Sequence, residues 1–213
     1  MVWSDKYRFS AFIIVLFHLA GWIGMDRSSY AMSFEQVSWA NILLSFILLL
    51  WCHEPGQDRW KLLVFVSTVV MLGILVEVAG VKTGLIFGSY HYTPVLGPAM
   101  LGVPVIIGIN WTMLTYAAAV TSSLFPMPLW MKVIAGSLIM VFCDLLLEGF
   151  AIRHHFWVWE GGTGPPLTNY IGWFIVSLLS NATFIWLIPD TKNKLAPFYL
   201  SVFLIFLVAD KLI

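Results

Sequence analysis

Three carboxylic acids lie inside apolar stretches of this chain. Asp144 and Glu148 are four residues apart and share one face if their stretch is helical. Glu77 lies in a second apolar stretch, with no further charge before Lys82. A carboxyl group in such surroundings is costly unless it is paired, protonated or used. Glu77, Asp144 and Glu148 are therefore the candidate catalytic residues.

The pair Asp144 and Glu148 has three interpretations. The acids could hold magnesium, as in membrane prenyltransferases, but that chemistry normally uses two acid clusters with basic residues, and one cluster is present here. They could pair with Arg153 or His154 at the membrane interface. They could also act as acid and base on an apolar substrate, since desolvation and a neighbouring like charge favour one neutral carboxyl group beside an ionised one. Acid–base chemistry is favoured. For Glu77 a functional role is favoured over a hydrogen bond to a neighbouring helix or pairing with Lys82.

Polar and aromatic side chains accompany these acids. Asn110 could orient a water molecule or tie helices together. Trp and Tyr collect at membrane interfaces whatever the function, yet their ring faces also stabilise cations. A carbocation intermediate would use them. The candidates of this kind are Trp111, Tyr116, Trp157, Trp159, Tyr170 and Trp173.

Metal and nucleic-acid binding are not expected. The loop histidines His91, His154 and His155 lack the acid or cysteine spacing of a metal site. Cys52 and Cys143 are far apart in apolar stretches and are expected to be buried thiols. The net charge is zero and no basic arm is present, so nothing indicates a nucleic-acid partner.

The elements that must position these residues are membrane helices. The chain is 60% hydrophobic and 10% charged over 213 residues, which no soluble domain of this size can bury. We expect one all-α integral-membrane domain, residues 1–213, forming a polytopic bundle of about seven spans. An apolar run of about 20 residues crosses a bilayer as a helix. The expected spans are residues 9–23, 34–51, 60–80, 103–124, 131–150, 170–188 and 197–212.

Two long connectors, residues 81–102 and 151–169, are rich in Gly, Pro and aromatic residues and follow odd-numbered spans. We expect both to be ordered and to lie on one side, where sites are usually built. The acids, Asn110 and Trp173 then fall in the leaflet next to these loops. Seven lysines and arginines are expected on the N-terminal side and four on the other, which makes the N-terminus cytoplasmic.

The loop motifs resemble the integral-membrane carotenoid hydratases, such as bisanhydrobacterioruberin hydratase and γ-carotene 1',2'-hydratase. The resemblance covers residues 72–174. One departure is Gly149, where that family commonly has proline. The motifs that carry the resemblance are Glu77-x6-Gly84, Phe87-Gly88-x-Tyr90-x-Tyr92, Leu96-Gly97, Gly102-Val103-Pro104, Asp144-x-x-x-Glu148-x-x-Ala151, Trp157-x-Trp159 and Pro166-Leu167-x-Asn169-Tyr170-x-Gly172-Trp173.

The resemblance implies addition of water across the terminal double bond of an acyclic carotenoid end group, without a cofactor. It adds Tyr90, Tyr92 and Asn169 to the candidate substrate-binding residues. The implied partners are the carotenoid, membrane lipids and other enzymes of the carotenoid pathway, in a bacterial or archaeal cell membrane.

The residues fit such a reaction. An alkene must be protonated and the tertiary cation captured by water, which needs a neutral acid, a base and aromatic faces. Two rivals stay open. A lycopene-type cyclase begins with the same protonation, and a carrier binds the carotenoid without turnover. Inverted repeats of a transporter are not evident in the sequence.

Overall fold

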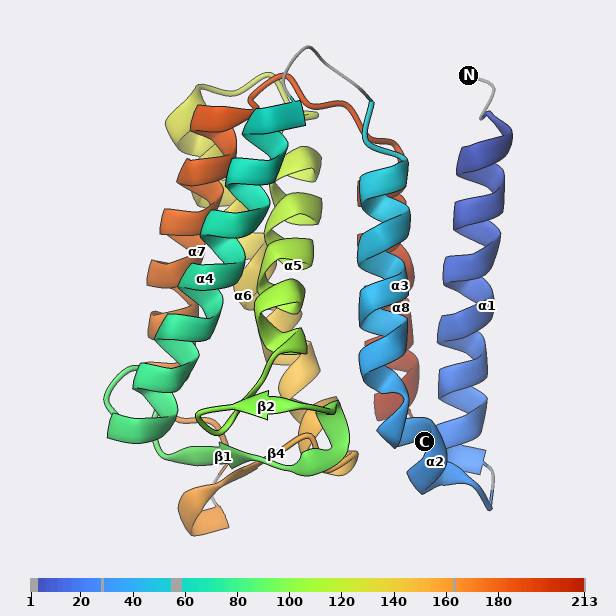
Figure 1. The fold of residues 1–213 in the computed structure, drawn as a ribbon, viewed down its shortest axis with the longest axis vertical. Helices are drawn as coiled ribbons and strands as arrows, with labels where there is room; N and C mark the ends of the chain where they lie inside the picture. Colours follow the sequence, from blue (N-terminus) through green and yellow to red (C-terminus); the bar gives the residue numbers. More distant parts are fainter. Residues whose placement is uncertain (1–3, 28, 55–58, 163, 213) are drawn as a thin grey trace.

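A computed structural model describes residues 4–27, 29–54, 59–162 and 164–212, and this part of the chain is mainly helical. The predicted all-α class is confirmed to that extent (Figure 1). The helices are α1 (Asp5–Arg27), α2 (Ala31–Gln36), α3 (Ser38–Trp51), α4 (Arg59–Thr83), α5 (Ile106–Ser122), α6 (Leu129–Arg153), α7 (Leu167–Leu187) and α8 (Leu195–Lys211).

Four of these helices, α1, α4, α6 and α7, are long and apolar enough to cross a membrane. The helices α5 and α8 have 17 residues each and α3 has 14. At about 1.5 Å per residue, 17 residues reach roughly 25 Å, less than the ~30 Å hydrocarbon layer. The expected count of seven spans therefore stays a prediction.

Two expected spans begin differently in the structure. The run from Phe34 is interrupted at Val37, where α2 ends and α3 begins. The run from Val103 starts as a strand, β3 (Val103–Pro104), and α5 begins at Ile106. Pro104 explains part of the delay, because the residue before a proline is disfavoured in the helical conformation and Val103 is therefore extended.

The two long connectors come together as short strands, which the sequence did not predict. The first connector contains β1 (Tyr90–Tyr92), a 3₁₀ turn η1 (Pro94–Leu96) and β2 (Ala99–Met100). The second contains β4 (Trp157–Trp159) and η2 (Glu160–Gly162). β1 pairs antiparallel with β4, and β2 pairs with β3. These strands lie below α4 to α7 in Figure 1.

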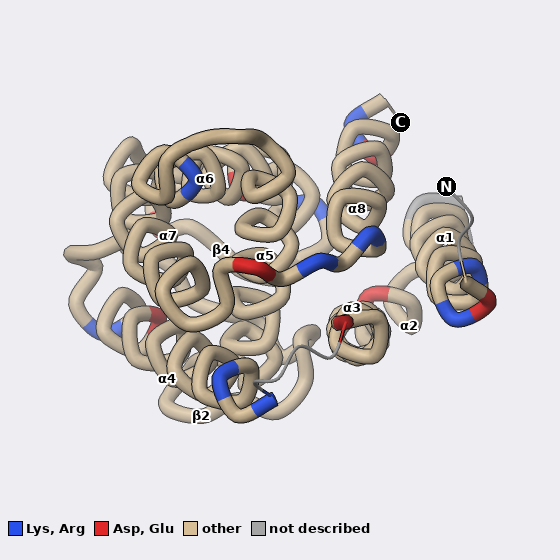
Figure 2. Tube along the Cα trace, turned by 90° about the horizontal axis from the view of Figure 1, so that it is seen from above, with Lys and Arg blue, Asp and Glu red and all other residues tan. Residues whose placement is uncertain are grey.

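The helix α5 forms the centre of the bundle. It contacts α3, α4, α6, α7 and α8, and nearly all of its residues are buried. Ala117, Ala118 and Ala119 give it a small-residue surface that lets its neighbours approach closely. Seen from above, α4 to α7 form one group, and α1, α3 and α8 lie to its side (Figure 2). Charged residues are few and gather mainly near helix ends.

Candidate active site

The strand pair β1–β4 presents aromatic side chains to the helix ends. Tyr90 is opposite Trp159 and Tyr92 is opposite Trp157. Because side chains alternate along a strand, these four share one face, and His91, on the other face, is exposed. The ring centroids of Tyr90 and Trp159 are 5.0 Å apart, and those of Tyr92 and Trp157 are 5.9 Å apart. The pairs form an aromatic layer beneath α4 and α6.

Glu77 reaches this layer from α4. Its side chain is buried, and its Oε2 accepts hydrogen bonds from the Tyr90 hydroxyl and, at 2.9 Å, from the Tyr92 hydroxyl. Its Oε1 accepts one from Trp111 Nε1 at 2.9 Å. Burial and the charge of Glu77 raise the pKa of both tyrosines well above the usual value, so the hydroxyls stay protonated and donate. Three donors therefore converge on one carboxylate.

Glu148 receives its donors from the other strand. Trp157 Nε1 and Trp159 Nε1 donate to its Oε2 at 3.1 Å and 2.9 Å. Asn169 Nδ2 lies 3.3 Å from its Oε1. α6 continues through Gly149 to Arg153, so Glu148 lies inside the helix and not at its end. Hydrogen bonds to ionised groups are the stronger kind, and this geometry suits a charged Glu148.

Asp144 differs from both glutamates. It is fully buried, and its Oδ2 accepts a hydrogen bond from Asn169 Nδ2 at 2.8 Å. Its Oδ1 is also buried and has no hydrogen-bond partner within the described part of the chain. The one amide nitrogen of Asn169 thus joins Asp144 to Glu148. Glu77 is near enough to interact electrostatically with both.

The remaining predicted residues do not all lie near the acids. Trp173 stacks on Trp111, with ring centroids 4.0 Å apart and an angle of 23°, beside Glu77. Tyr116 is not brought to the acids. Its hydroxyl lies 2.9 Å from His53 Nδ1 and 3.0 Å from Asn193 Nδ2, near the opposite end of α5. Its predicted contact with the substrate finds no support in this placement.

Asn110 lines a cavity of about 250 Å³ instead of contacting the acids. The cavity is lined by residues of α1, α2, α3, α5, α6 and α8. Leu147 and Trp157 also line it, and none of the three acids does. Trp157 therefore separates the cavity from Glu148.

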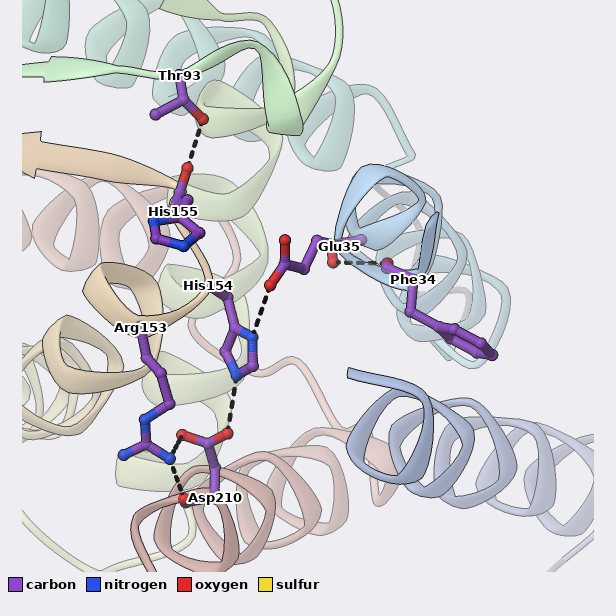
Figure 3. Close-up of polar contacts among 8 residues, drawn as sticks. Phe34, Glu35, Thr93, Arg153, His154, His155 and Asp210 are labelled. Carbon is purple, nitrogen blue, oxygen red and sulfur yellow. Dashed lines mark hydrogen bonds and ion pairs between the residues drawn. The ribbon is translucent and has the colours of Figure 1, made fainter. Parts of the chain in front are cut away.

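The proposed partners of the acid pair, Arg153 and His154, are engaged elsewhere (Figure 3). Arg153 Nη1 forms an ion pair with Asp210 Oδ2 at 3.0 Å. His154 Nε2 lies 2.9 Å from Asp210 Oδ1, and its Nδ1 lies 3.1 Å from Glu35 Oε1. The interpretation that Asp144 and Glu148 pair with Arg153 or His154 is wrong. Glu35 and Asp210 were not singled out from the sequence, although an acid near the end of an apolar helix is a signal of function or pairing.

A magnesium site also fits poorly. The lone pairs that a cation would need on Glu148 already accept three N–H groups. Among the described residues, no group of three or more His, Cys, Asp and Glu side chains is placed to hold a metal ion. The arrangement is instead that of three buried carboxyl groups held by hydrogen-bond donors under an aromatic layer.

Comparison with known proteins identifies a matching protein family. A family model described as "Carotenoid biosynthesis protein" matches residues 37–212. No curated protein and no solved structure matches the chain. The matched range contains all three acids, both strands of the aromatic layer and most of the cavity wall.

Proposed function

Because the chain belongs to the carotenoid biosynthesis protein family, we propose that it is a cofactor-independent hydratase of acyclic carotenoids. It adds water across the terminal double bond of the end group and forms a tertiary alcohol. The family supports a carotenoid as substrate, and the apolar helices support delivery from the bilayer. The three buried acids support chemistry that begins with protonation.

One observation carries the assignment of roles. Glu77 and Glu148 each accept hydrogen bonds from three donors, whereas Asp144 accepts one and has a buried oxygen without a partner. Donors favour the ionised form of a carboxyl group, and burial with a neighbouring like charge favours the neutral form. Asp144 therefore carries the proton on Oδ1, and the two glutamates are ionised.

The reaction then proceeds in two steps. The O–H bond of Asp144 breaks as the alkene forms a new C–H bond at its less substituted carbon, which leaves a tertiary cation. Water attacks the cation through oxygen, and a proton of that water passes to Glu148 or Glu77 acting as base. The proton returns to Asp144 before the next turnover, and the shared hydrogen-bond donor Asn169 keeps Asp144 and Glu148 close enough for that return.

The aromatic layer stabilises the cation and excludes other water. Ring faces attract a cation within about 6 Å of the centroid. Trp157 and Trp159 of the layer contact Glu148, and outside the layer Trp111 contacts Glu77 and stacks on Trp173. Excluding water protects the cation until the positioned molecule attacks. Because the acids are closed off, the end group reaches Asp144 only when an aromatic side chain moves, and Trp157 lies between Glu148 and the neighbouring cavity.

Expression in a host that makes an acyclic carotenoid tests the proposal. Mass analysis should find the carotenoid plus one water for each modified end, with an unshifted chromophore and a more polar product. Asp144→Asn should lower the amount of product roughly 100-fold or more. Glu160→Gln, at an exposed acid in the connector 151–169, should leave the amount of product unchanged. A less polar, blue-shifted product would instead indicate a cyclase, and bound carotenoid without product would indicate a carrier.

A further inference from the structure

The cavity beside the acids is apolar except at a few points. Its wall includes the rings of Phe34, Phe150, Phe156, Phe203 and Phe206. These rings and the aliphatic side chains between them provide the surface that a hydrocarbon chain requires. Its volume of about 250 Å³ corresponds to several water molecules at roughly 30 Å³ each.

The polar points include the hydroxyl groups of Ser38, Ser45 and Tyr199 and several amide and imidazole acceptors. Asn41 Oδ1 is buried and has no partner among the residues that the structure describes. His18 Nδ1 lies 2.8 Å from the carbonyl oxygen of Ile14, so Nδ1 carries the hydrogen and the neutral ring keeps an acceptor at Nε2. Asn110 adds an amide group that both donates and accepts. His18, Asn41 and Asn110 come from α1, α3 and α5 and line the same cavity.

An apolar cavity with unused acceptors matches an alcohol better than an alkene. A hydroxyl group donates one hydrogen bond and accepts others, whereas a hydrocarbon end group offers no donor. A hydrocarbon that filled the cavity would leave Asn41 Oδ1 without a partner, and buried acceptors without partners are costly.

We propose that this cavity is a binding site for the hydroxylated end of an isoprenoid chain. The assignment rests on the proposed function, because the tertiary alcohol is the product of the hydration. Trp157 forms part of the cavity wall and donates to Glu148, so the site adjoins the acids across a single side chain. The product end group moves past Trp157 into the cavity, and the acids become free for the next alkene.

A polar network lies next to the residues of the cavity wall. Phe34 and Phe150 line it, and the adjoining turns carry Glu35 and His154, which are hydrogen-bonded (Figure 3). His154 also contacts Asp210, one turn beyond Phe206. These hydrogen bonds hold α2, α6 and α8, which carry part of the cavity wall, to one another.

Two probe molecules without a double bond test binding at the site, because the protein cannot hydrate them. The alcohol probe is tetrahydromyrcenol, an acyclic terpene tertiary alcohol, and the control probe is the alkane of the same skeleton. We expect the full-length protein in nanodiscs to bind the alcohol roughly ten-fold or more tightly than the alkane, by titration calorimetry or ligand-observed NMR. Equal affinity for the two probes would overturn the proposal.

Two variants locate the binding. Asn41→Leu should lower the affinity for the alcohol to that for the alkane. Gly21→Leu should abolish binding of both, because Gly21 lines the cavity and a Cβ there meets only Phe206 at 4.0 Å, which leaves room for a side chain to fill the space. Leu16→Phe, on the exposed face of the same helix, is the matched control and should change neither affinity. Unchanged binding in Gly21→Leu would place the probes outside this cavity.

The outcome is separable from that of the proposed function. Asp144→Asn should lose hydration and keep the preference for the alcohol, because Asp144 does not line the cavity. If the protein prefers the alcohol but adds no water to any carotenoid, the hydratase proposal fails and the cavity remains an alcohol site. If it hydrates carotenoids but shows no preference, only the present inference fails.

Discussion

At the scale of single residues, the three acids are distinguished by their hydrogen-bond donors. Two tyrosines and a tryptophan donate hydrogen bonds to Glu77, and two tryptophans and an asparagine donate hydrogen bonds to Glu148. Asp144 accepts a hydrogen bond from the same asparagine, and its Oδ1 has no hydrogen-bond partner in the described part of the chain. The sequence predicted the acids and the need for one neutral carboxyl group. Assigning the proton to Asp144 depends on knowing which donors the glutamates have, and the donors to Glu77 come from residues 13 to 34 positions away along the chain.

Infrared spectroscopy of the protein in membranes tests that assignment. At neutral pH we expect a carbonyl stretching band of a buried, protonated carboxyl group, because Oδ1 of Asp144 carries the proton. The band should be missing from Asp144→Asn. It should persist in Glu77→Gln and in Glu148→Gln, which serve as matched controls. A band that survives in Asp144→Asn and disappears in either glutamine variant would assign the proton to a glutamate.

At the scale of elements, the helices were largely predictable and the strands were not. Long apolar runs fix α4, α6 and α7 because backbone groups in a bilayer must be satisfied within the helix. The three-residue strands β1 and β4 are too short to show an alternating pattern. They pair across a long sequence separation, which local patterns do not reveal. Tyr116 lies six residues after Asn110 on α5, and its hydroxyl contacts His53 and Asn193, partners that its residue type does not reveal.

The helix α7 approaches the first connector closely at Gly172. A Cβ at Gly172 would lie 2.7 Å from the carbonyl oxygen of Ile86 and 2.8 Å from the Phe87 ring. We therefore expect Gly172→Ala to push α7 outward and to lower the free energy of unfolding by roughly 1 to 3 kcal/mol. Because Asn169 is one turn earlier on α7, hydration should fall roughly 10- to 100-fold.

Thermal unfolding in detergent and product yield measure the two effects. Gly21→Ala is the matched control for stability, since its new Cβ has space and alanine favours a helix over glycine. It should be neutral or slightly stabilising. A Gly172→Ala protein with unchanged stability and yield would show that the connector can shift freely, and that α7 does not need this contact to hold Asn169.

At the scale of the whole molecule, the two groups of helices are joined by the network of Glu35, Arg153, His154 and Asp210 (Figure 3). Glu35 comes from α2, Asp210 from α8, and Arg153 and His154 from the end of α6. The sequence showed each charge but not the partners, because α2, α6 and α8 are far apart along the chain. Buried charges of this kind are strongly destabilising when one partner is lost.

Asp210→Asn tests this link between the helix groups. The substitution keeps the side-chain size but removes the charge that faces Arg153 and His154. We expect the free energy of unfolding to fall by roughly 2 to 3 kcal/mol, less than for a fully buried pair because the Arg153 side chain is 40% exposed. Asp190→Asn, at an exposed acid, is the control and should change stability by about 0.5 kcal/mol or less. Equal stability of the two variants would mean that apolar packing alone joins the groups.

The most direct test of the account is hydration by the purified protein in heavy-oxygen water. Wild-type protein supplied with an acyclic carotenoid should place one heavy oxygen atom on the tertiary carbon of each modified end, and Asp144→Asn should place none. A wild-type product that contains no heavy oxygen, or labelled product formed equally by Asp144→Asn, would contradict the account.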